Sequence, residues 1–333
     1  MKINMDGWTA ELSFPKTIDN TILSSWATCK RKCFFSHFLH LHPKQISIHL
    51  HAGAAYAKAL ETLRDNFYTV DSDAYKNSEL SLTRAVRALF ESFGYDESYD
   101  AYAETTNKSC ERLVDALIAY VKHHPLRTDG VQPLIGSDGK VMTEQSYTMP
   151  LEMLHPDTQD PILYHGRADM VVEFMGEPFL YDDKTTSQLG STWINKWDFR
   201  SQFDAYTLGF KKSGIDTVGT IIRGHCFLKN EVKFMDAISR RQQWQLDQWF
   251  EDAHQILFEM IMYYNRAKEM FEAGQEKLML YKLFPATGRF NEACSAYAGC
   301  EFKALCESQH IQRRLADYRI RVWDPTNPER SDT

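Results

Sequence analysis

Two runs of strand-forming residues, separated by only two residues, constrain the fold of this chain more than any other feature. The first run is YHGRADMVVEF (164–174), the second is EPFLYDDKTTS (177–187), and the dipeptide MG alone links them. Both runs are rich in apolar, aromatic and β-branched residues, which are typical of strands. A link this short favours a β-hairpin, in which the two strands lie side by side.

Acidic residues lie where these two strands would meet. Asp169 ends the text HGRAD in the first strand, and Asp182 and Lys184 lie near the end of the second. Because side chains alternate along a strand, Asp182 and Lys184 share one face and Asp183 lies on the other. Two close carboxylates repel each other, so such a pair normally needs a cation between them. Oxygen ligands of this kind suit Mg²⁺ or Mn²⁺.

A lysine beside such a cation has a chemical use. Lys184 can orient or deprotonate a water molecule, or neutralise charge that develops on a phosphate. The carboxylates and the lysine together predict metal-assisted hydrolysis of a phosphodiester. In the text RSQFDAYTLGF, Gln202 and Tyr206 are four residues apart and share one face of a predicted helix. The same spacing is also that of an ordinary amphipathic helix with a tyrosine in the core.

The remaining periodicity predicts a mixed α/β chain. Helical spacing of apolar residues dominates the first 125 residues, and strand-like text dominates the middle of the chain. The predicted helices cover 22–41, 53–68, 80–94, 101–123, 198–212 and 239–270, and further strands cover 141–151, 217–229 and 232–238. We therefore expect one α/β domain over residues 1–333, with a helical insertion over 70–125.

The composition excludes few functions. The chain has 333 residues, a formal net charge of −7, 43% hydrophobic and 25% charged residues, which is ordinary for a folded soluble protein. No apolar run approaches the roughly 18 residues that span a membrane. The N-terminal text MKINMDGWTAELSF lacks the apolar segment of a secretory signal, so we expect a cytoplasmic protein without a membrane partner. The negative charge neither favours nor excludes nucleic acid, because a basic groove can be local.

Three short sequence motifs occur in a characteristic order, namely GRAD (166–169), LYDDKT (180–185) and QFDAY (202–206). In order and spacing they resemble the PD-(D/E)XK nuclease superfamily, and within it the RecB-type branch. That branch includes the AddB nuclease domain and the CRISPR-associated adaptation exonucleases. The resemblance implies a restriction-endonuclease-like α/β core, in which helices flank a central mixed sheet. It also fits a bacterial or phage protein.

The resemblance implies a role for each matching residue. Asp169 and Asp182 would bind the metal, and Lys184 would be catalytic. Gln202 and Tyr206 would support the site and the DNA backbone. Asp183 would point away, or would join the metal site only through its main chain.

One position departs from the family pattern. The RecB-type motif has a histidine metal ligand on an early helix. In GAAYAKALE (53–61), Ala57 stands at the position of that histidine. Glu61, one turn further along, is the better substitute, and His51 is out of register. The alternative for Glu61 is a solvated charge paired with Lys58 or Arg64, each three residues away.

Three of the seven cysteines lie close together near the C-terminus, at Cys294, Cys300 and Cys306. In a cytoplasmic chain such a group suggests a metal or a redox site before a disulfide framework. A metal site or an iron–sulfur cluster usually needs four thiolates, so the fourth would be Cys29 or Cys33. We interpret the isolated Cys110 and Cys226 as packing residues.

The same resemblance favours Cys29 as the fourth ligand. CKRKCFF (29–35) looks like the text that opens the iron–sulfur members of this branch, although Lys30 replaces a usual proline. It implies a [4Fe–4S] cluster that joins Cys29 to a C-terminal segment over 290–310, with Cys33 as the back-up ligand. Zinc, or cysteines without any metal, are the alternatives. The cluster would clamp the two ends of the chain.

These observations predict a Mg²⁺- or Mn²⁺-dependent DNA exonuclease that acts on single strands or DNA ends in recombination, repair or phage DNA processing. The alternative is a DNA-binding or scaffold protein that has lost efficient cleavage. A redox enzyme is disfavoured because no glycine-rich nucleotide loop is present, and unwinding would need a helicase or recombination partner. Basic and aromatic residues that are candidates for DNA contact are Lys30, Arg31, Lys32, Arg240, Arg241, Arg313, Arg314, Trp26, Phe34 and Trp244.

Overall fold

The computed structural model describes residues 2–5, 8–45, 47–94, 108–275, 280–296, 299–308 and 311–327. The chain forms two compact units, each assembled from separated segments. The first unit contains residues 1–45, 148–166 and 247–333, and the second contains 46–147 and 167–246. None of the described helices combines the length and the apolar character that crossing a bilayer requires.

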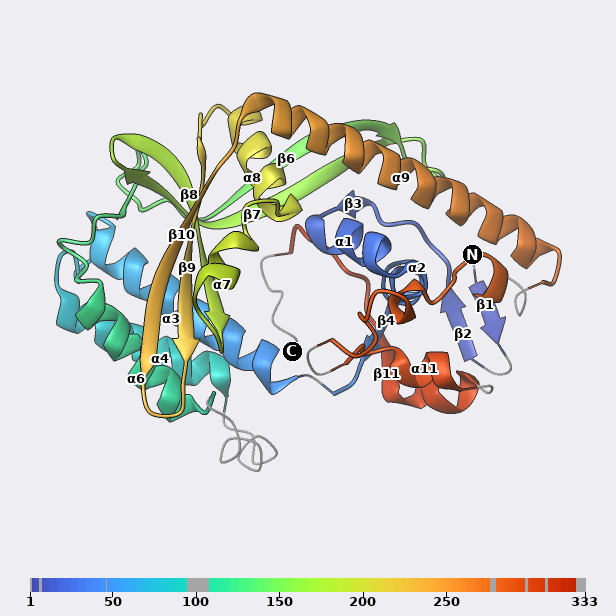
Figure 1. Ribbon diagram of the computed structural model, residues 1–333, viewed down its shortest axis with the longest axis horizontal. Coiled ribbons are helices and arrows are strands. Elements are labelled where there is room, and N and C mark those ends of the chain that lie inside the picture. Colours follow the sequence, from blue (N-terminus) through green and yellow to red (C-terminus); the bar gives the residue numbers. More distant parts are fainter. Residues whose placement is uncertain are drawn as a thin grey trace. The chain divides into compact units, whose positions relative to one another are not determined.

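A mixed β-sheet forms the centre of the second unit (Figure 1). Its strands follow the order β10-β9-β8-β7, and both β5 and β6 also pair with β7. The pairing of β8 with β9 is parallel, whereas β7 with β8 and β9 with β10 are antiparallel. The bounds are β5 Gln132–Pro133, β6 Thr143–Leu154, β7 Pro161–Phe174, β8 Glu177–Thr186, β9 Gly219–Phe227 and β10 Val232–Arg240.

The predicted hairpin is confirmed as β7 and β8. Its last pair is Phe174 with Glu177, so Met175 and Gly176 form the turn. Both have positive φ, 53° and 79°, which is the backbone of a two-residue type I′ turn. Glycine adopts this conformation without strain, and this local chemistry sets the register of the strands that carry the acidic residues.

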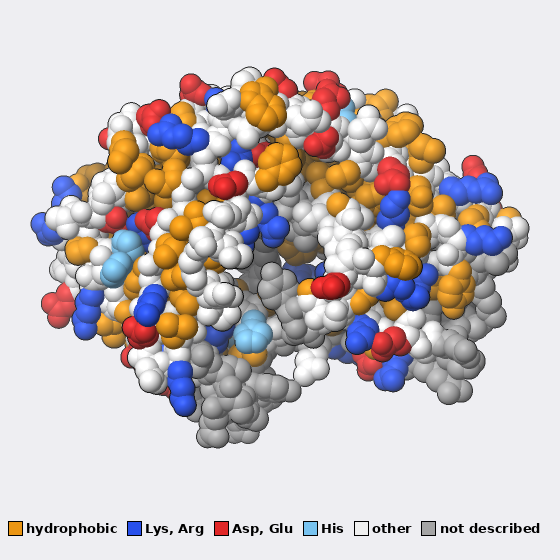
Figure 2. Space-filling model, in the orientation of Figure 1, with side chains coloured by type: hydrophobic (Ala, Val, Ile, Leu, Met, Phe, Trp, Pro, Cys, Tyr) orange, Lys and Arg blue, Asp and Glu red, His pale blue; other side chains and the backbone are white. Residues whose placement is uncertain are grey.

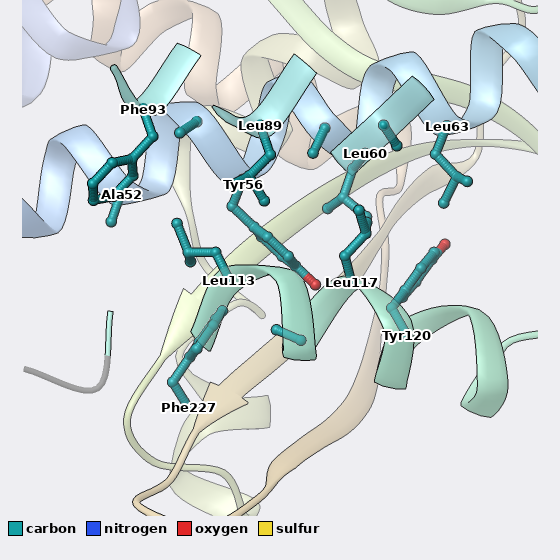
Figure 3. Close-up of a cluster of buried hydrophobic side chains, with 14 of the residues drawn as sticks. Ala52, Tyr56, Leu60, Leu63, Leu89, Phe93, Leu113, Leu117, Tyr120 and Phe227 are labelled. Atoms are coloured by element: carbon teal, nitrogen blue, oxygen red, sulfur yellow. The ribbon is translucent and has the colours of Figure 1, made fainter. Parts of the chain in front are cut away.

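Three helices pack against one face of this sheet. They are α3 (Ile48–Tyr68), α4 (Ser78–Phe93) and α6 (Cys110–His123). The predicted apolar stripe of the first helix, Tyr56, Leu60, Leu63 and Phe67, is no more than 1% exposed. Figure 3 shows side chains of α3, α4 and α6 meeting in one cluster, to which Phe227 of β9 also belongs. The first seven residues of the predicted helix 101–123 lie outside the described residues.

Two helices lie on the other face of the sheet, namely α7 (Ser191–Asn195) and α8 (Ser201–Lys212). Gly224 in β9 shows how closely α7 approaches, because a Cβ atom added there would lie 2.5 Å from the ring of Trp193. A side chain at position 224 would therefore push α7 away from the sheet. Helices on both faces of a central mixed sheet confirm the predicted fold class.

The first unit contains both ends of the chain. The predicted helix 22–41 is divided into α1 (Asn20–Thr28), α2 (Lys30–Cys33) and the π-helix η1 (Phe34–Phe38), because Cys29 has an extended backbone between the first two. Asp19 caps α1 by accepting a 2.9 Å hydrogen bond from the Ile22 N–H. The remaining elements are β1 Lys2–Met5, β2 Trp8–Glu11, β3 Thr17–Ile18, β4 Leu41–Pro43, η2 Thr287–Arg289, α11 Lys303–Glu307, η3 Ile311–Asp317 and β11 Tyr318–Ile320.

Strand and helix segments of the first unit are held by their own pairings. β3 runs parallel to the start of β7, and β4 pairs antiparallel with β11. The predicted long helix 239–270 is confirmed as α9 (Gln243–Glu272). In it, Trp249 packs edge-on against Tyr164, and Tyr264 and Lys268 bind the carboxylate of Asp157.

Candidate active site

Strand β8 presents two chemically different faces. Tyr181 and Asp183 lie on the face that α3 and α6 cover, because Arg64 of α3 donates hydrogen bonds to both. Asp182 and Lys184 alternate with them and lie on the face toward α7 and α8. The parallel pairing with β9 places Lys184 beside Gly224, the residue that α7 covers most closely.

Asp169 and Asp182 form a pair of carboxylates on neighbouring strands. Met170 pairs with Tyr181 at the end of the β7–β8 ladder, so Asp169 and Asp182 come immediately after it. Burial and the charge of Asp182 raise the pKa of Asp169 well above its usual range. Burial also raises the pKa of Asp182, which is only 2% exposed, although Lys184 opposes this shift. Two buried carboxylates of this kind are stabilised by a cation.

The ammonium group of Lys184 lies at this pair. Its Nζ atom is 2.5 Å from Oδ2 of Asp182, and the side chain is 31% exposed. Burial alone would lower the pKa of Lys184, but the carboxylates of Asp182 and Asp169 outweigh burial and raise it. Lys184 is therefore a cation that contacts the site on one side and solvent on the other.

Helix α8 adds two polar groups. The amide Nε2 of Gln202 lies 3.4 Å from Oδ1 of Asp182 and 2.9 Å from the hydroxyl of Tyr206. Both residues face the carboxylates because they are four apart on one side of the helix. Burial raises the pKa of Tyr206, so its hydroxyl stays protonated. The structure thus brings five sequence-predicted residues together: Asp169, Asp182, Lys184, Gln202 and Tyr206.

The carboxylate of Asp183 belongs to a different set of contacts on the opposite face. It accepts hydrogen bonds from Arg64 at 2.6 Å and from the Tyr181 hydroxyl at 2.9 Å, and it lies 2.8 Å from Nε2 of His225. Burial would raise the pKa of Asp183, but Arg64 and His225 lower it far below its usual range. His225 is oriented in turn by Tyr56, whose hydroxyl lies 3.0 Å from Nδ1. The side chain of Asp183 thus anchors strand β8 to α3 and β9.

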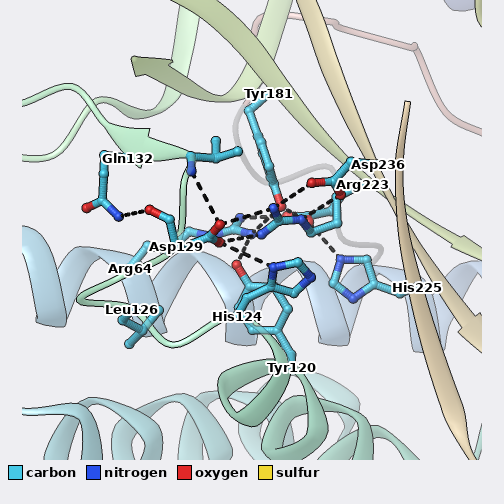
Figure 4. A network of polar contacts seen from close by, with 12 residues as sticks. Arg64, Tyr120, His124, Leu126, Asp129, Gln132, Tyr181, Arg223, His225 and Asp236 are labelled. Atoms are coloured by element: carbon cyan, nitrogen blue, oxygen red, sulfur yellow. Dashed lines mark hydrogen bonds and ion pairs between the residues drawn. The ribbon is translucent and has the colours of Figure 1, made fainter. Parts of the chain in front are cut away.

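A second buried ion-pair group continues this polar layer (Figure 4). Arg223 of β9 is 1% exposed and contacts Asp129 at 2.6 Å and Asp236 at 2.7 Å. Sequence reasoning missed Arg64, Arg223 and His225. The available signal was the text TIIRGHCF, where an arginine and a histidine interrupt an otherwise apolar strand and therefore need buried partners.

The early helix α3 contacts the Asp183 face. Glu61 lies in an ion pair with Lys58 at 2.9 Å, one of the two pairings that the sequence offered as alternatives to metal binding. His51 has its Nε2 2.6 Å from the carbonyl oxygen of Phe93. Within the described part of the chain, no three His, Cys, Asp or Glu side chains are grouped closely enough to hold a metal ion. The structure therefore does not join Glu61 or His51 to the pair of Asp169 and Asp182.

The four cysteines predicted to act together are neighbours in the first unit. A Cβ added to Gly288 would lie 3.2 Å from Sγ of Cys294 and 3.6 Å from Cβ of Cys29. The N–H of Cys300 donates a 3.1 Å hydrogen bond to the carbonyl of Cys294. Burial raises the pKa of Cys306, with smaller contributions from the nearby Cys29 and Cys300. In the described residues these thiols do not meet the spacing of a metal-binding group.

Several of the basic residues proposed for DNA contact form hydrogen bonds or ion pairs within the protein. Arg31 is buried and donates to the carbonyls of Phe284 and Leu280, and Lys30 pairs with Glu259. Of the three candidate aromatic rings, Trp26 and Phe34 are buried and Trp244 is 62% exposed. Figure 2 shows acidic, basic and apolar side chains interspersed on the visible face. The sequence-based basic candidates therefore do not by themselves define a nucleic-acid surface.

Comparisons with known proteins bear on the site. A family model described as the PD-(D/E)XK nuclease superfamily matches residues 20–307. A search of curated proteins gave no match. Among solved structures, the crystal structure of SSO0001 matches with 11% sequence identity and covers 80% of this chain and 98% of that chain. Its TM-score of 0.28 is too low to support an argument about the site.

Proposed function

Because the chain belongs to the PD-(D/E)XK nuclease superfamily, we propose that it is a metal-dependent DNA exonuclease that acts on single strands or DNA ends. The observation that carries this proposal is the convergence of Asp169, Asp182 and Lys184 on one face of β8, with Gln202 and Tyr206 facing them from α8. Within the superfamily, the texts GRAD and LYDDKT and the cysteine pattern favour the RecB/AddB-type branch. The proposed setting is recombination, repair or phage DNA processing, with a helicase or recombination protein as partner.

The proposed metal ligands are Asp169 and Asp182, with the main chain of Asp183 beside them. These residues fit a divalent cation, because both carboxylates are held close together and each has a raised pKa. Mg²⁺ commonly binds to one or two carboxylates and completes its coordination with water and substrate phosphate, and Mn²⁺ suits the same oxygen ligands. When bound, such an ion supplies Lewis acidity and a more acidic water molecule. Glu61 is the proposed third ligand on the family pattern alone, because it pairs with Lys58 on the helix that covers the opposite face of β8.

The remaining side chains would position and stabilise the reacting phosphate. Lys184 is charged and partly exposed, so it is placed to stabilise negative charge that develops on the phosphate oxygens. Gln202 donates to Asp182 and to Tyr206, and so holds that carboxylate in place. The Asp183 main chain does the same for Asp169 through a 2.8 Å hydrogen bond.

We also propose that Cys29, Cys294, Cys300 and Cys306 bind a [4Fe–4S] cluster with a structural role. The support is the cysteine pattern and the proximity of these residues in the first unit. Cys33, which is fully buried, is the alternative fourth ligand, and zinc is the alternative centre. The cluster would link Cys29, at the junction of α1 and α2, to the C-terminal segment 290–310, and both are far along the sequence from the carboxylates.

The test is degradation of end-labelled single- and double-stranded DNA by protein purified without oxygen, with Mg²⁺ or Mn²⁺ added. Lys184→Ala should lower the rate by roughly two to four orders of magnitude and keep DNA affinity within a few-fold. The matched control is Lys211→Ala, because Lys211, near the C-terminal end of α8, forms a surface ion pair with Asp216 and is not one of the predicted site residues. Activity of Lys184→Ala within a few-fold of the parent would refute the assignment.

A second candidate function is a DNA-binding or scaffold protein with impaired cleavage. It is favoured by Ala57, which replaces a histidine ligand of the family pattern, and by the pairing of Glu61 with Lys58. The same assay separates the two candidates. Tight DNA binding without metal-dependent degradation would support the scaffold and overturn the exonuclease proposal.

A further inference from the structure

The segment that links α7 to α8 carries an exposed aromatic ring close to the candidate site. This segment, KWDFR (196–200), ends just before Ser201, the first residue of α8, and Gln202 follows (Figure 1). The side chain of Phe199 is 82% exposed. A phenylalanine exposed to this extent, on a segment that leads into α8, forgoes the roughly 1.5–3 kcal/mol that burial of such a ring ordinarily contributes, and its ring is available to a ligand.

The backbone of this segment is firmly held. Trp197 is 5% exposed and packs edge-on against Trp193 and at a tilt against Phe203. Its carbonyl oxygen accepts hydrogen bonds from Ser239 and Arg241, each at 3.2 Å. The segment that presents Phe199 is therefore held in place at Trp197.

Two cations flank the exposed ring. Lys196 lies 4.2 Å and Arg200 6.0 Å from the ring centre of Trp197, so both pack on the same anchored side chain. Neither forms an ion pair with an acidic residue in the part of the chain that the structure describes. Burial, Arg200 and Lys184 all lower the pKa of Lys196, so the three cations are neighbours. The linking segment thus extends positive charge from Lys184 toward Phe199.

Uncompensated cations beside a site for phosphodiester chemistry match the charge of a nucleic-acid backbone. An exposed aromatic ring beside them offers a surface on which a base can stack, with a contribution of about 1–3 kcal/mol for each base. A base inside a duplex already stacks on its neighbours and is not free to do so. The combination therefore discriminates in favour of an unpaired strand.

We propose that Lys196, Phe199 and Arg200 form a subsite that holds an unpaired nucleic-acid strand beside the carboxylate pair. The two cations contact phosphates, and Phe199 stacks on a base. This inference rests on the proposed nuclease function and specifies its substrate as a single strand. The subsite contributes to binding and acts through KM, since none of its residues contacts Asp169 or Asp182.

The test compares four variants in binding and in cleavage. Binding is measured by fluorescence anisotropy in the Lys184→Ala background with EDTA, using a labelled oligothymidylate of about 16 nucleotides. Phe199→Ala should weaken this binding about 10-fold, and Phe199→Tyr should restore it, because tyrosine keeps the stacking ring. Lys196→Gln and Arg200→Gln should each reduce the slope of log affinity against log salt by about 0.7. In the active parent, Phe199→Ala should raise KM and leave kcat within about two-fold.

The matched control is Phe90→Ala on α4, because Phe90 is also exposed, at 53%, and lies on a helix of the same unit. Phe90→Ala should bind the oligothymidylate as the parent does. A parent that degrades DNA while Phe199→Ala binds single strands unchanged would overturn the subsite and leave the nuclease proposal intact. A parent that neither binds nor degrades DNA would overturn both. Weakened binding by Phe199→Ala in a parent without cleavage would support the subsite and overturn the nuclease.

Discussion

The main-chain N–H of Asp183 donates a 2.8 Å hydrogen bond to the carboxylate of Asp169, on the neighbouring strand. The side chain of Asp183 meanwhile lies on the other face of β8, where it binds Arg64 and His225. One residue thus positions a site carboxylate with its backbone and anchors the strand with its side chain. The chemistry of one face of β8 depends on the ion pairs of the other.

This arrangement predicts that replacing two adjacent aspartates by asparagine has different effects: one replacement abolishes cleavage and the other lowers stability. Asp182→Asn should abolish metal-dependent cleavage and keep the free energy of unfolding, because a buried carboxylate with a raised pKa does not stabilise the fold by its charge. Asp183→Asn should lower the free energy of unfolding by about 3–5 kcal/mol, because it leaves the buried Arg64 without a counter-charge. Urea unfolding and a cleavage assay of both variants test this. Equal stability of the two would contradict it.

The third metal ligand is testable on α3. Glu61→Gln should raise the Mn²⁺ concentration needed for half-maximal cleavage about 10-fold, as expected for a ligand or its close support. Loss of the surface pair with Lys58 alone would cost at most about 1 kcal/mol of stability and would not change the metal requirement. His51→Ala serves as control, because His51 contacts the Phe93 carbonyl. A larger metal effect from His51→Ala would reverse the assignment.

The four cysteines predict a coloured protein. Purified without oxygen, the parent should be brown with about four irons per chain. Ser replacement at Cys29, Cys294, Cys300 or Cys306 should give colourless, less soluble protein, because structural metal centres contribute on the order of ten kcal/mol to folding.

Two other cysteines provide the controls. Cys110→Ser and Cys226→Ser should keep the colour, since these residues lie in the second unit. A colourless, folded parent with one zinc would replace the cluster by a zinc site. Colour retained in Cys29→Ser and lost in Cys33→Ser would move the fourth ligand to Cys33.

A buried histidine makes stability depend on pH. Burial lowers the pKa of His37 from 6.5 to about 3. Between these values the unfolded chain binds the proton and the folded chain does not, so stability is complete above pH 6.5 and falls as the pH decreases toward 3. Lowering the pH from 7 to 5 should therefore cost the parent about 2 kcal/mol more than it costs His37→Leu. Urea unfolding at both pH values measures this, and identical losses would contradict it.

Local features of the fold followed from the sequence. The hairpin was predictable because a two-residue link between two strand-like runs permits few other structures, and Met175 and Gly176 form its turn with a left-handed backbone. Alternation then separates Asp182 and Lys184 from Asp183, since the side-chain period of a strand is two. The spacing of Gln202 and Tyr206 on one helix face is equally local.

Contacts between distant segments required the tertiary structure. Arg64 and Asp183 are 119 residues apart, and no local pattern pairs them. Their meeting depends on α3 packing against one face of the sheet. Likewise, Trp197, which lies two residues before the exposed Phe199, is anchored by Ser239 and Arg241, which are 42 and 44 residues away in the sequence. Sequence determined which side chains each element presents, because that depends on local geometry, whereas packing of separate elements decided which of them meet.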